Sequence, residues 1–89
     1  MAATDAKIKQ IVNELEGRLA VDNGVPRNIR KGAAEAVNYL QDGNKALDLR
    51  ISSALSVLEN LCNDPNIPME SWSTIMQILS ELEVVLKEI

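Results

Sequence analysis

Asp22-Asn23-Gly24-Val25-Pro26 interrupts a helical pattern in this 89-residue chain, and a stretch of the same kind, Asp64-Pro65-Asn66-Ile67-Pro68, returns 42 residues later. In each stretch an Asp follows the end of a helix-like pattern, and a β-branched residue then leads into a proline. A residue before proline is driven toward extended geometry, and proline is favoured at the first helical position, where no N–H is needed. The two stretches therefore predict matched turns, after which new helices begin at Pro26 and Pro68.

Apolar residues recur at helical spacing on both sides of each turn. Thr4 is the predicted N-cap of the first helix, and Asn23-Gly24 is predicted to end that helix in the left-handed conformation. Asp42-Gly43-Asn44 indicates a tight polar turn in the middle of the chain. The stripes consist of Ile8, Ile11, Val12, Leu15 and Leu19; Ile29, Ala33, Ala36, Val37 and Leu40; Leu47, Ile51, Ala54, Leu55, Leu58 and Leu61; and Trp72, Ile75, Met76, Leu79, Leu82 and Leu86.

These four stripes predict an all-α protein. Aromatic residues make up only 2% of the chain, so the core must be aliphatic, which suits helix-on-helix packing. A period near 42 is typical of HEAT-type repeats, but about three repeats are needed to bury a continuous core. We expect one helical domain over residues 1–89, folded as an antiparallel four-helix bundle of two hairpins (about 5–41 and about 44–88), with a HEAT-like pair as the alternative. A true duplication of the hairpin stays open, because unrelated helical hairpins also resemble each other.

Two glycines fall inside predicted helices. Gly17 costs about 1 kcal/mol relative to Ala, so either a neighbouring backbone comes close to it or the cost is tolerated. The small segment Gly32-Ala33-Ala34 permits a close approach between helices.

The composition argues against most catalytic chemistry. The chain has no His, which removes the commonest general base and metal ligand and the usual nucleophilic triads. No phosphate-binding or dinucleotide-binding glycine motif occurs. The acids are scattered, and we predict a solvated face containing Glu81, Glu83 and Glu88 rather than a carboxylate metal site. We therefore expect no enzyme, no cofactor and no bound metal.

The sequence also favours residence in the cytoplasm. Cys62 is the only cysteine, which fits a reducing compartment, and it is interpreted as a small core residue rather than a redox group. No apolar run approaches about 18 residues, so no membrane span is expected. Residues 1–7 lack the basic and apolar segments of a signal peptide.

Charge is distributed unevenly. Residues 1–45 hold seven Lys/Arg against six Asp/Glu, whereas residues 46–89 hold two against seven, giving the net charge of −4. The basic residues Arg27, Arg30 and Lys31 follow the first turn, in the first turns of a helix where the helix dipole disfavours cations.

This basic cluster has two interpretations. Asp22, Glu35 or acids of the second half could pair with its side chains. Alternatively, Arg27, Arg30 and Lys31 form an anion or RNA contact, helped by the free N–H groups of the helix start but without an aromatic platform for stacking. The second turn offers no equivalent, since residues 69–72 read Met-Glu-Ser-Trp.

The apolar stripe of the last helix is wider than a single packing seam requires. Ile78, Val85 and Ile89 broaden it. Burial inside the bundle is one explanation. The other is that these three side chains continue the core across a symmetric dimer or onto a partner helix, from which a small aliphatic domain gains most.

Three runs carry a family resemblance: DNGVPRNIR at 22–30, AAEA at 33–36 and SVLENLCNDPNIPM at 56–69. They resemble a family of short archaeal proteins of unknown function, over about residues 8–82. The resemblance implies an all-α four-helix fold and cytosolic residence, and it supplies no activity, cofactor or catalytic residue. We predict a non-catalytic helical interaction module that associates with itself or with a protein partner. The alternative is an RNA- or ribosome-associated accessory factor that uses the basic cluster.

Overall fold

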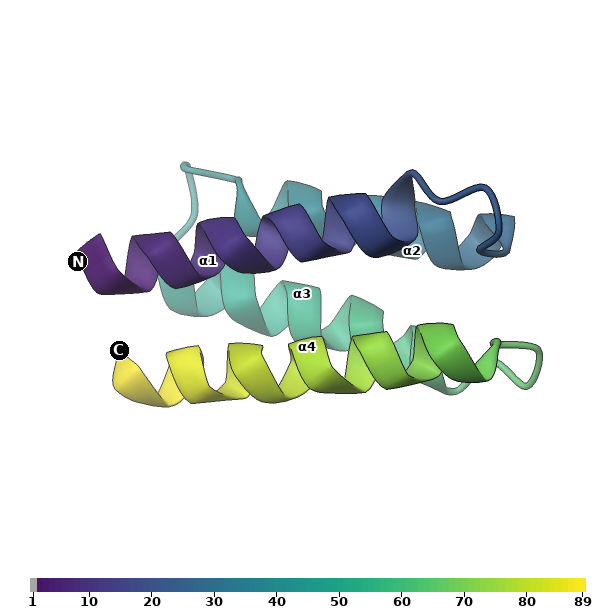
Figure 1. Ribbon diagram of the computed structural model, residues 1–89. Coiled ribbons are helices and arrows are strands. Elements are labelled where there is room, and N and C mark those ends of the chain that lie inside the picture. The colour runs from purple at the N-terminus through teal and green to yellow at the C-terminus, as the bar shows by residue number, and fades with distance from the viewer. Residues whose placement is uncertain (1) are drawn as a thin grey trace.

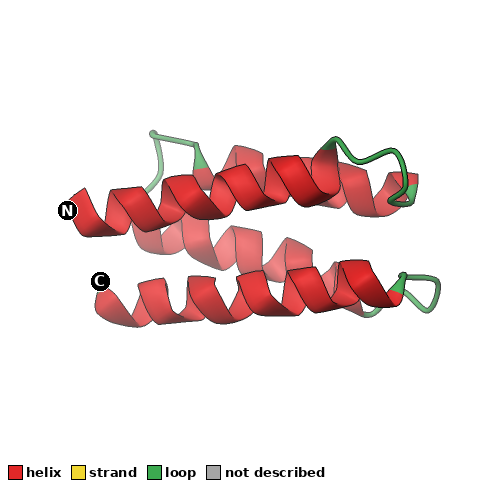
Figure 2. Cartoon of the chain, in the orientation of Figure 1, coloured by secondary structure: helices red, strands yellow, loops and turns green. Residues whose placement is uncertain are grey.

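A computed structural model describes residues 2–89 of the chain. Within them it contains the helices α1 (Ala2–Leu15), α2 (Arg27–Leu40), α3 (Leu47–Cys62) and α4 (Met69–Glu88) and no strand. The helix α1 continues into a π-helical turn, η1 (Glu16–Ala20). The helices run alternately in opposite directions, so the two ends of the described chain lie at one end of the bundle (Figure 1 and Figure 2). The predicted all-α, four-helix fold is confirmed.

The helices close into a ring. Helix α1 packs on α2, α2 on α3 and α3 on α4, and α4 returns to α1. The most extensive contact joins α2 and α3, which belong to different predicted hairpins. The helices within each predicted hairpin, α1 with α2 and α3 with α4, also pack on each other, and the α2–α3 contact joins the two pairs. The core of the bundle is aliphatic, with these largest fully buried side chains: Ile11, Leu15, Leu19, Ile29, Leu40, Ile51, Leu58, Ile75, Ile78, Leu82 and Val85.

Glycine explains the close approach of α2 to α3. A Cβ atom placed on Gly32 would lie 2.6 Å, 2.7 Å and 2.9 Å from three side-chain atoms of Leu61. Leu61 therefore occupies the space that any larger residue at position 32 would need, as the small segment predicted. Gly17 is different, because a Cβ atom there would meet nothing within 4 Å. The cost of a glycine in this helical turn is simply tolerated.

The three loops between helices share one hydrogen-bonding pattern. Each begins with an Asp whose Oδ1 accepts the backbone N–H two residues later, at 2.9 Å for Asp22, 3.1 Å for Asp42 and 2.8 Å for Asp64. The carbonyl of the same Asp accepts the N–H three residues later. Such side-chain bonds stabilise a turn by occupying donors that no helix can use. The matched turn of the sequence therefore occurs three times and not twice.

The residue before each following helix is extended. Pro26 has φ −54° and ψ 148°, and Pro68 has φ −62° and ψ 146°. In the middle loop Ala46 takes the same place with φ −61° and ψ 148°. Because Ala46 is not a proline, the sequence pattern did not reveal that Asp42 opens an equivalent turn.

Ala46→Pro is expected to raise the free energy of unfolding by about 0.4–1 kcal/mol, because it restricts the unfolded chain without straining the fold. The φ of Ala46 already suits proline, and within residues 2–89 its N–H donates no hydrogen bond. Urea unfolding measures the change. The control Ala34→Pro, in the middle of α2, should lose about 3 kcal/mol or more. A destabilised Ala46→Pro variant would contradict the equivalence of the three turns.

The boundaries of the helices correct several predictions. Thr4 is not an N-cap, because α1 already begins at Ala2. The left-handed ending at Asn23-Gly24 is also wrong, because the described chain contains no residue with positive φ. Instead the chain leaves the helix through η1, where Val21 donates its N–H to the carbonyl of Glu16 at 3.1 Å. Pro26 and Pro68 are N-caps, so the helices begin one residue later than predicted.

Candidate functional site

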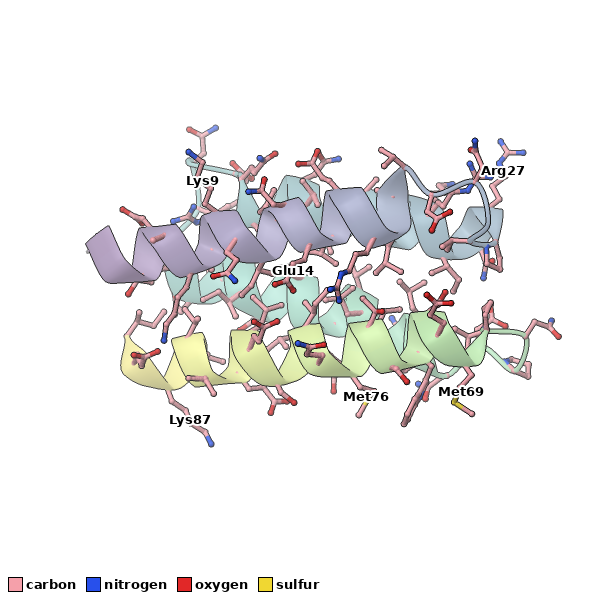
Figure 3. The ribbon with its side chains drawn as sticks, viewed as in Figure 1. Lys9, Glu14, Arg27, Met69, Met76 and Lys87 are labelled. Atoms are coloured by element: carbon pink, nitrogen blue, oxygen red, sulfur yellow. The ribbon has the colours of Figure 1, made fainter. Side chains whose placement is uncertain are left out.

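The basic cluster lies at the end of the bundle that holds the first and third turns (Figure 1). Arg27 and Lys31 are exposed and Arg30 is half-buried, and Figure 3 shows Arg27 pointing away from the helices. Within residues 2–89, no carboxylate oxygen lies within 4.0 Å of these three side chains. The ion pairs with Asp22 or Glu35 that the sequence allowed are thus absent from this part of the chain.

The acids near the cluster have other roles. Asp22 accepts the N–H of Gly24 within its own turn. Asp64 accepts a hydrogen bond from the side-chain amide of Asn28, one residue after Arg27. This bond ties the start of α2 to the turn before α4, so the first and third turns lie at the same end of the bundle. The Nε of Arg30 is buried and has no hydrogen-bond partner among the described residues.

The predicted interface residues of the last helix divide into two groups. Ile78 and Val85 are fully buried in the bundle's own core, whereas Ile89 is half exposed. Burial, which was the competing explanation, therefore accounts for Ile78 and Val85, and neither presents a surface that a partner could contact.

A different line of apolar side chains is exposed on α4. Met69 is 77% exposed, Trp72 40% and Met76 39%. Their spacing of three and four residues places them along one side of the helix, and Figure 3 shows Met69 and Met76 extending away from the other helices. The sequence placed Trp72 and Met76 in the same apolar stripe as the core residues of the last helix, but both are more than a third exposed. The sequence did contain one indication of this face: residues 69–72 after the last Pro are Met-Glu-Ser-Trp, where the basic cluster follows the first Pro.

A groove of about 340 Å³ continues this line between α3 and α4. Its apolar lining comes from Cys62, Met76 and Leu79, and Glu59 and Glu83 contribute its charges, with Asn63 and Ser80 completing it. We call Met69, Trp72, Met76, Cys62 and Leu79 the methionine face, and Glu59 and Glu83 its acidic rim.

Cys62 forms part of the floor of the groove. Its Sγ lies 3.9 Å from the Sδ of Met76. Burial raises the pKa of the Cys62 thiol above its ordinary value, and the charge of Glu59 raises it further. A thiol with a raised pKa is a poor nucleophile, because only the thiolate reacts. Cys62 is partly exposed and packs at the edge of the core, so it is not the fully buried core residue that the sequence suggested.

One acid of the predicted solvated face is not solvated. Glu81 is half-buried, and its Oε1 is buried with no hydrogen-bond partner in the described chain. Burial raises the pKa of Glu81, the neighbouring carboxylate of Glu14 raises it further, and the charge of Arg18 opposes both effects. Glu83 and Glu88 are exposed as predicted, and Glu88 pairs with Lys7 at 3.0 Å.

Glu81→Gln is expected to raise the melting temperature at pH 7. A folded-state pKa above the ordinary value of 4.5 means that the folded protein favours the protonated carboxyl. The stability that protonation supplies is complete below about pH 4.5 and is lost as pH rises through the folded pKa. Gln stays neutral throughout, so the advantage of the variant should shrink as pH falls from 7 toward 4.5. Melting curves over that range test this, with exposed Glu83→Gln as the control; a constant advantage would refute it.

Other candidate sites are less informative. A cavity of about 560 Å³ lies between η1 and the start of α4. Its lining includes both Arg18 and the acids Asp22 and Glu70, so it favours neither anions nor cations. The described residues contain no group of three or more His, Cys, Asp or Glu arranged to hold a metal ion. None of the helices in residues 2–89 is long and apolar enough to cross a membrane.

Comparisons with known proteins show which family the chain belongs to. A family model described as "Uncharacterised protein family (UPF0147)" matches residues 1–85. A UPF0147 protein of Pyrococcus furiosus is 34% identical over 85 residues, covering 96% of this chain and 91% of the relative. The crystal structure of a UPF0147 protein from Thermoplasma acidophilum matches with a TM-score of 0.88 at 32% identity, over 96% of this chain and 99% of that one. Protein MMP1188, of unknown function, matches with a TM-score of 0.82 at 39% identity, over 86% of both chains. The chain therefore belongs to UPF0147, the archaeal family that its turn motifs resemble.

Proposed function

We propose that this protein is a non-catalytic helical module that binds another protein through the methionine face. The observation that carries the proposal is the exposure of Met69, Trp72 and Met76 in one line on α4. Trp and Met are enriched at the cores of protein interfaces, and Met adapts its shape to different partners. Tyr39, the remaining aromatic residue, is also exposed but lies on α2 and belongs to no such line.

The cost of leaving these side chains in water supports a binding role. Burial of apolar surface contributes about 25 cal/mol per Å², so an aliphatic core this small would gain by covering Trp72. On α4 it is Ile75, Ile78 and Leu82 that are buried in the core, and Trp72 stays partly in water. A partner that covers the methionine face recovers this free energy.

A pull-down from cells that make the protein tests the proposal. Tagged wild type, Met69→Ser/Met76→Ser and Val84→Ser are compared, with nuclease present. Val84 is an exposed apolar residue of α4 outside the methionine face, so its variant controls for a general loss of surface hydrophobicity. We expect a protein that wild type and Val84→Ser retain and the double Met variant loses. Equal retention by all three, or none by wild type, would rule the proposal out.

A second candidate function is supported by the unpaired basic cluster. Arg27, Arg30 and Lys31 form no ion pair within the described chain, and charges left free at a helix start are suited to phosphate. An RNA-associated role would appear in the same pull-down without nuclease. RNA retained by wild type at low salt and lost by Arg27→Glu/Arg30→Glu supports it, and no RNA on wild type ends it.

A further inference from the structure

The methionine face has the shape of a site for a helix. Residues Met69 to Met76 span about 10 Å of α4, and the groove extends the same line to Glu83, about 21 Å from Met69 at 1.5 Å per residue. The exposed residues along this line are anchors spaced by three and four, and the groove beside them is formed between two helices, α3 and α4. Amphipathic helices bind in grooves of this kind, with anchors at i, i+3, i+4 and i+7.

The charged residues around the groove favour a positively charged partner. Glu59 stands on α3 and Glu83 on α4, so the acidic rim flanks the apolar floor from both helices, and no Lys or Arg lines the groove. Glu59 lies near enough to Cys62, on the floor of the groove, for its negative charge to add to the effect of burial in raising the pKa of that thiol. Lys87 extends from the same side of α4 as Met69 and Met76 (Figure 3), one turn beyond Glu83 and outside the groove.

From this geometry we infer that the partner is a basic amphipathic helix, whose apolar side covers the methionine face while its Lys or Arg residues contact the acidic rim. The inference rests on the proposed function and names the chemistry of the partner. A second copy of the chain fits less well. In a symmetric dimer both chains contribute the same patch, so the interface would carry two acidic rims from chains that each have a net charge of −4. Like charges placed opposite one another disfavour association.

Trp72 is the only tryptophan, so its fluorescence reports directly on the methionine face. The probe is a synthetic amphipathic helix of about 20 residues, long enough to cover the groove, with Leu on one side and Lys on the other. Two reference peptides accompany it: one with Glu in place of every Lys, and one with the composition of the probe but no helical period. We expect the Lys peptide to shift Trp72 emission to shorter wavelength and to bind at least about tenfold more tightly than the Glu peptide.

Charge reversal provides the matched control. Glu59→Lys/Glu83→Lys should weaken binding of the Lys peptide by at least about tenfold and strengthen binding of the Glu peptide. Glu16→Lys/Glu35→Lys changes the net charge equally, at exposed sites on η1 and α2, and should change the preference little. Circular dichroism confirms that both variants remain folded.

The outcomes separate the inference from the proposed function. Equal binding of the Lys and Glu peptides, equal binding of the aperiodic peptide, or no binding overturns the basic helix as the partner. So does a dimer in light scattering whose formation Met76→Ser abolishes. If the pull-down still retains a protein that depends on Met69 and Met76, the interaction module stands and only the chemistry assigned to its partner fails.

Discussion

Val85→Asp is expected to unfold the protein, whereas Val84→Asp leaves it folded. The two residues are adjacent on α4 and identical in type, but Val85 is 1% exposed and Val84 51%. An Asp at position 85 would place an unpaired charge in an aliphatic core, which costs several kcal/mol even after relaxation. The free energy of unfolding of native proteins is only about 5–15 kcal/mol, and this domain of 89 residues is a small one. Exposed substitutions usually change stability by no more than about 0.5 kcal/mol.

Far-ultraviolet circular dichroism and urea unfolding distinguish the outcomes. The comparison also separates the two explanations of the wide stripe on the last helix. If Val85 lay at an interface between chains, Val85→Asp would give a folded monomer in light scattering. Loss of helical signal in Val85→Asp, with normal unfolding of Val84→Asp, is the result that burial requires. A folded monomeric Val85→Asp protein would mean that Val85 is not part of the core of the bundle.

The fold was predictable because local signals and the core agree. Apolar residues at helical spacing define the core positions of α1 and α2 almost completely, and the turns at Asp22 and Asp64 fix where α2 and α4 begin. The third equivalent turn escaped detection because Ala46 reaches the proline conformation without being proline. A pattern of residue types cannot reveal a backbone conformation that an ordinary residue also adopts.

The candidate site was harder to predict. The apolar residues of α4 cover more than half of its circumference, and periodicity alone does not say which side meets the bundle. Contacts with α1 and α3 decide it: they bury Ile78 and Val85 and leave Met69, Trp72 and Met76 outside. The same limit applies to Glu81, because the approach of Glu14 depends on how α4 returns to α1. Features that depend on contacts between distant segments are not contained in local spacing.

Gly32→Leu is expected to lower the free energy of unfolding by about 1–3 kcal/mol, the usual range for overpacking. Leu forms helices better than Gly by nearly 1 kcal/mol, so any loss is measured against this gain. The gain should be outweighed, because even the first carbon of a side chain at position 32 would overlap Leu61. The overlap lies at the α2–α3 contact, the most extensive in the bundle. Urea unfolding measures the loss.

Two further variants show whether the loss comes from this contact. Gly17→Ala changes a helical glycine that has free space around it, and it should gain up to about 1 kcal/mol. Gly32→Leu/Leu61→Ala removes the side chain that causes the overlap. The double variant should therefore lose less free energy of unfolding than the two single variants lose in sum. Additive effects, or a stable Gly32→Leu protein, would show that α2 and α3 can move apart at little cost. Non-additive effects would show that the loss comes from the overlap between position 32 and Leu61 at the α2–α3 contact.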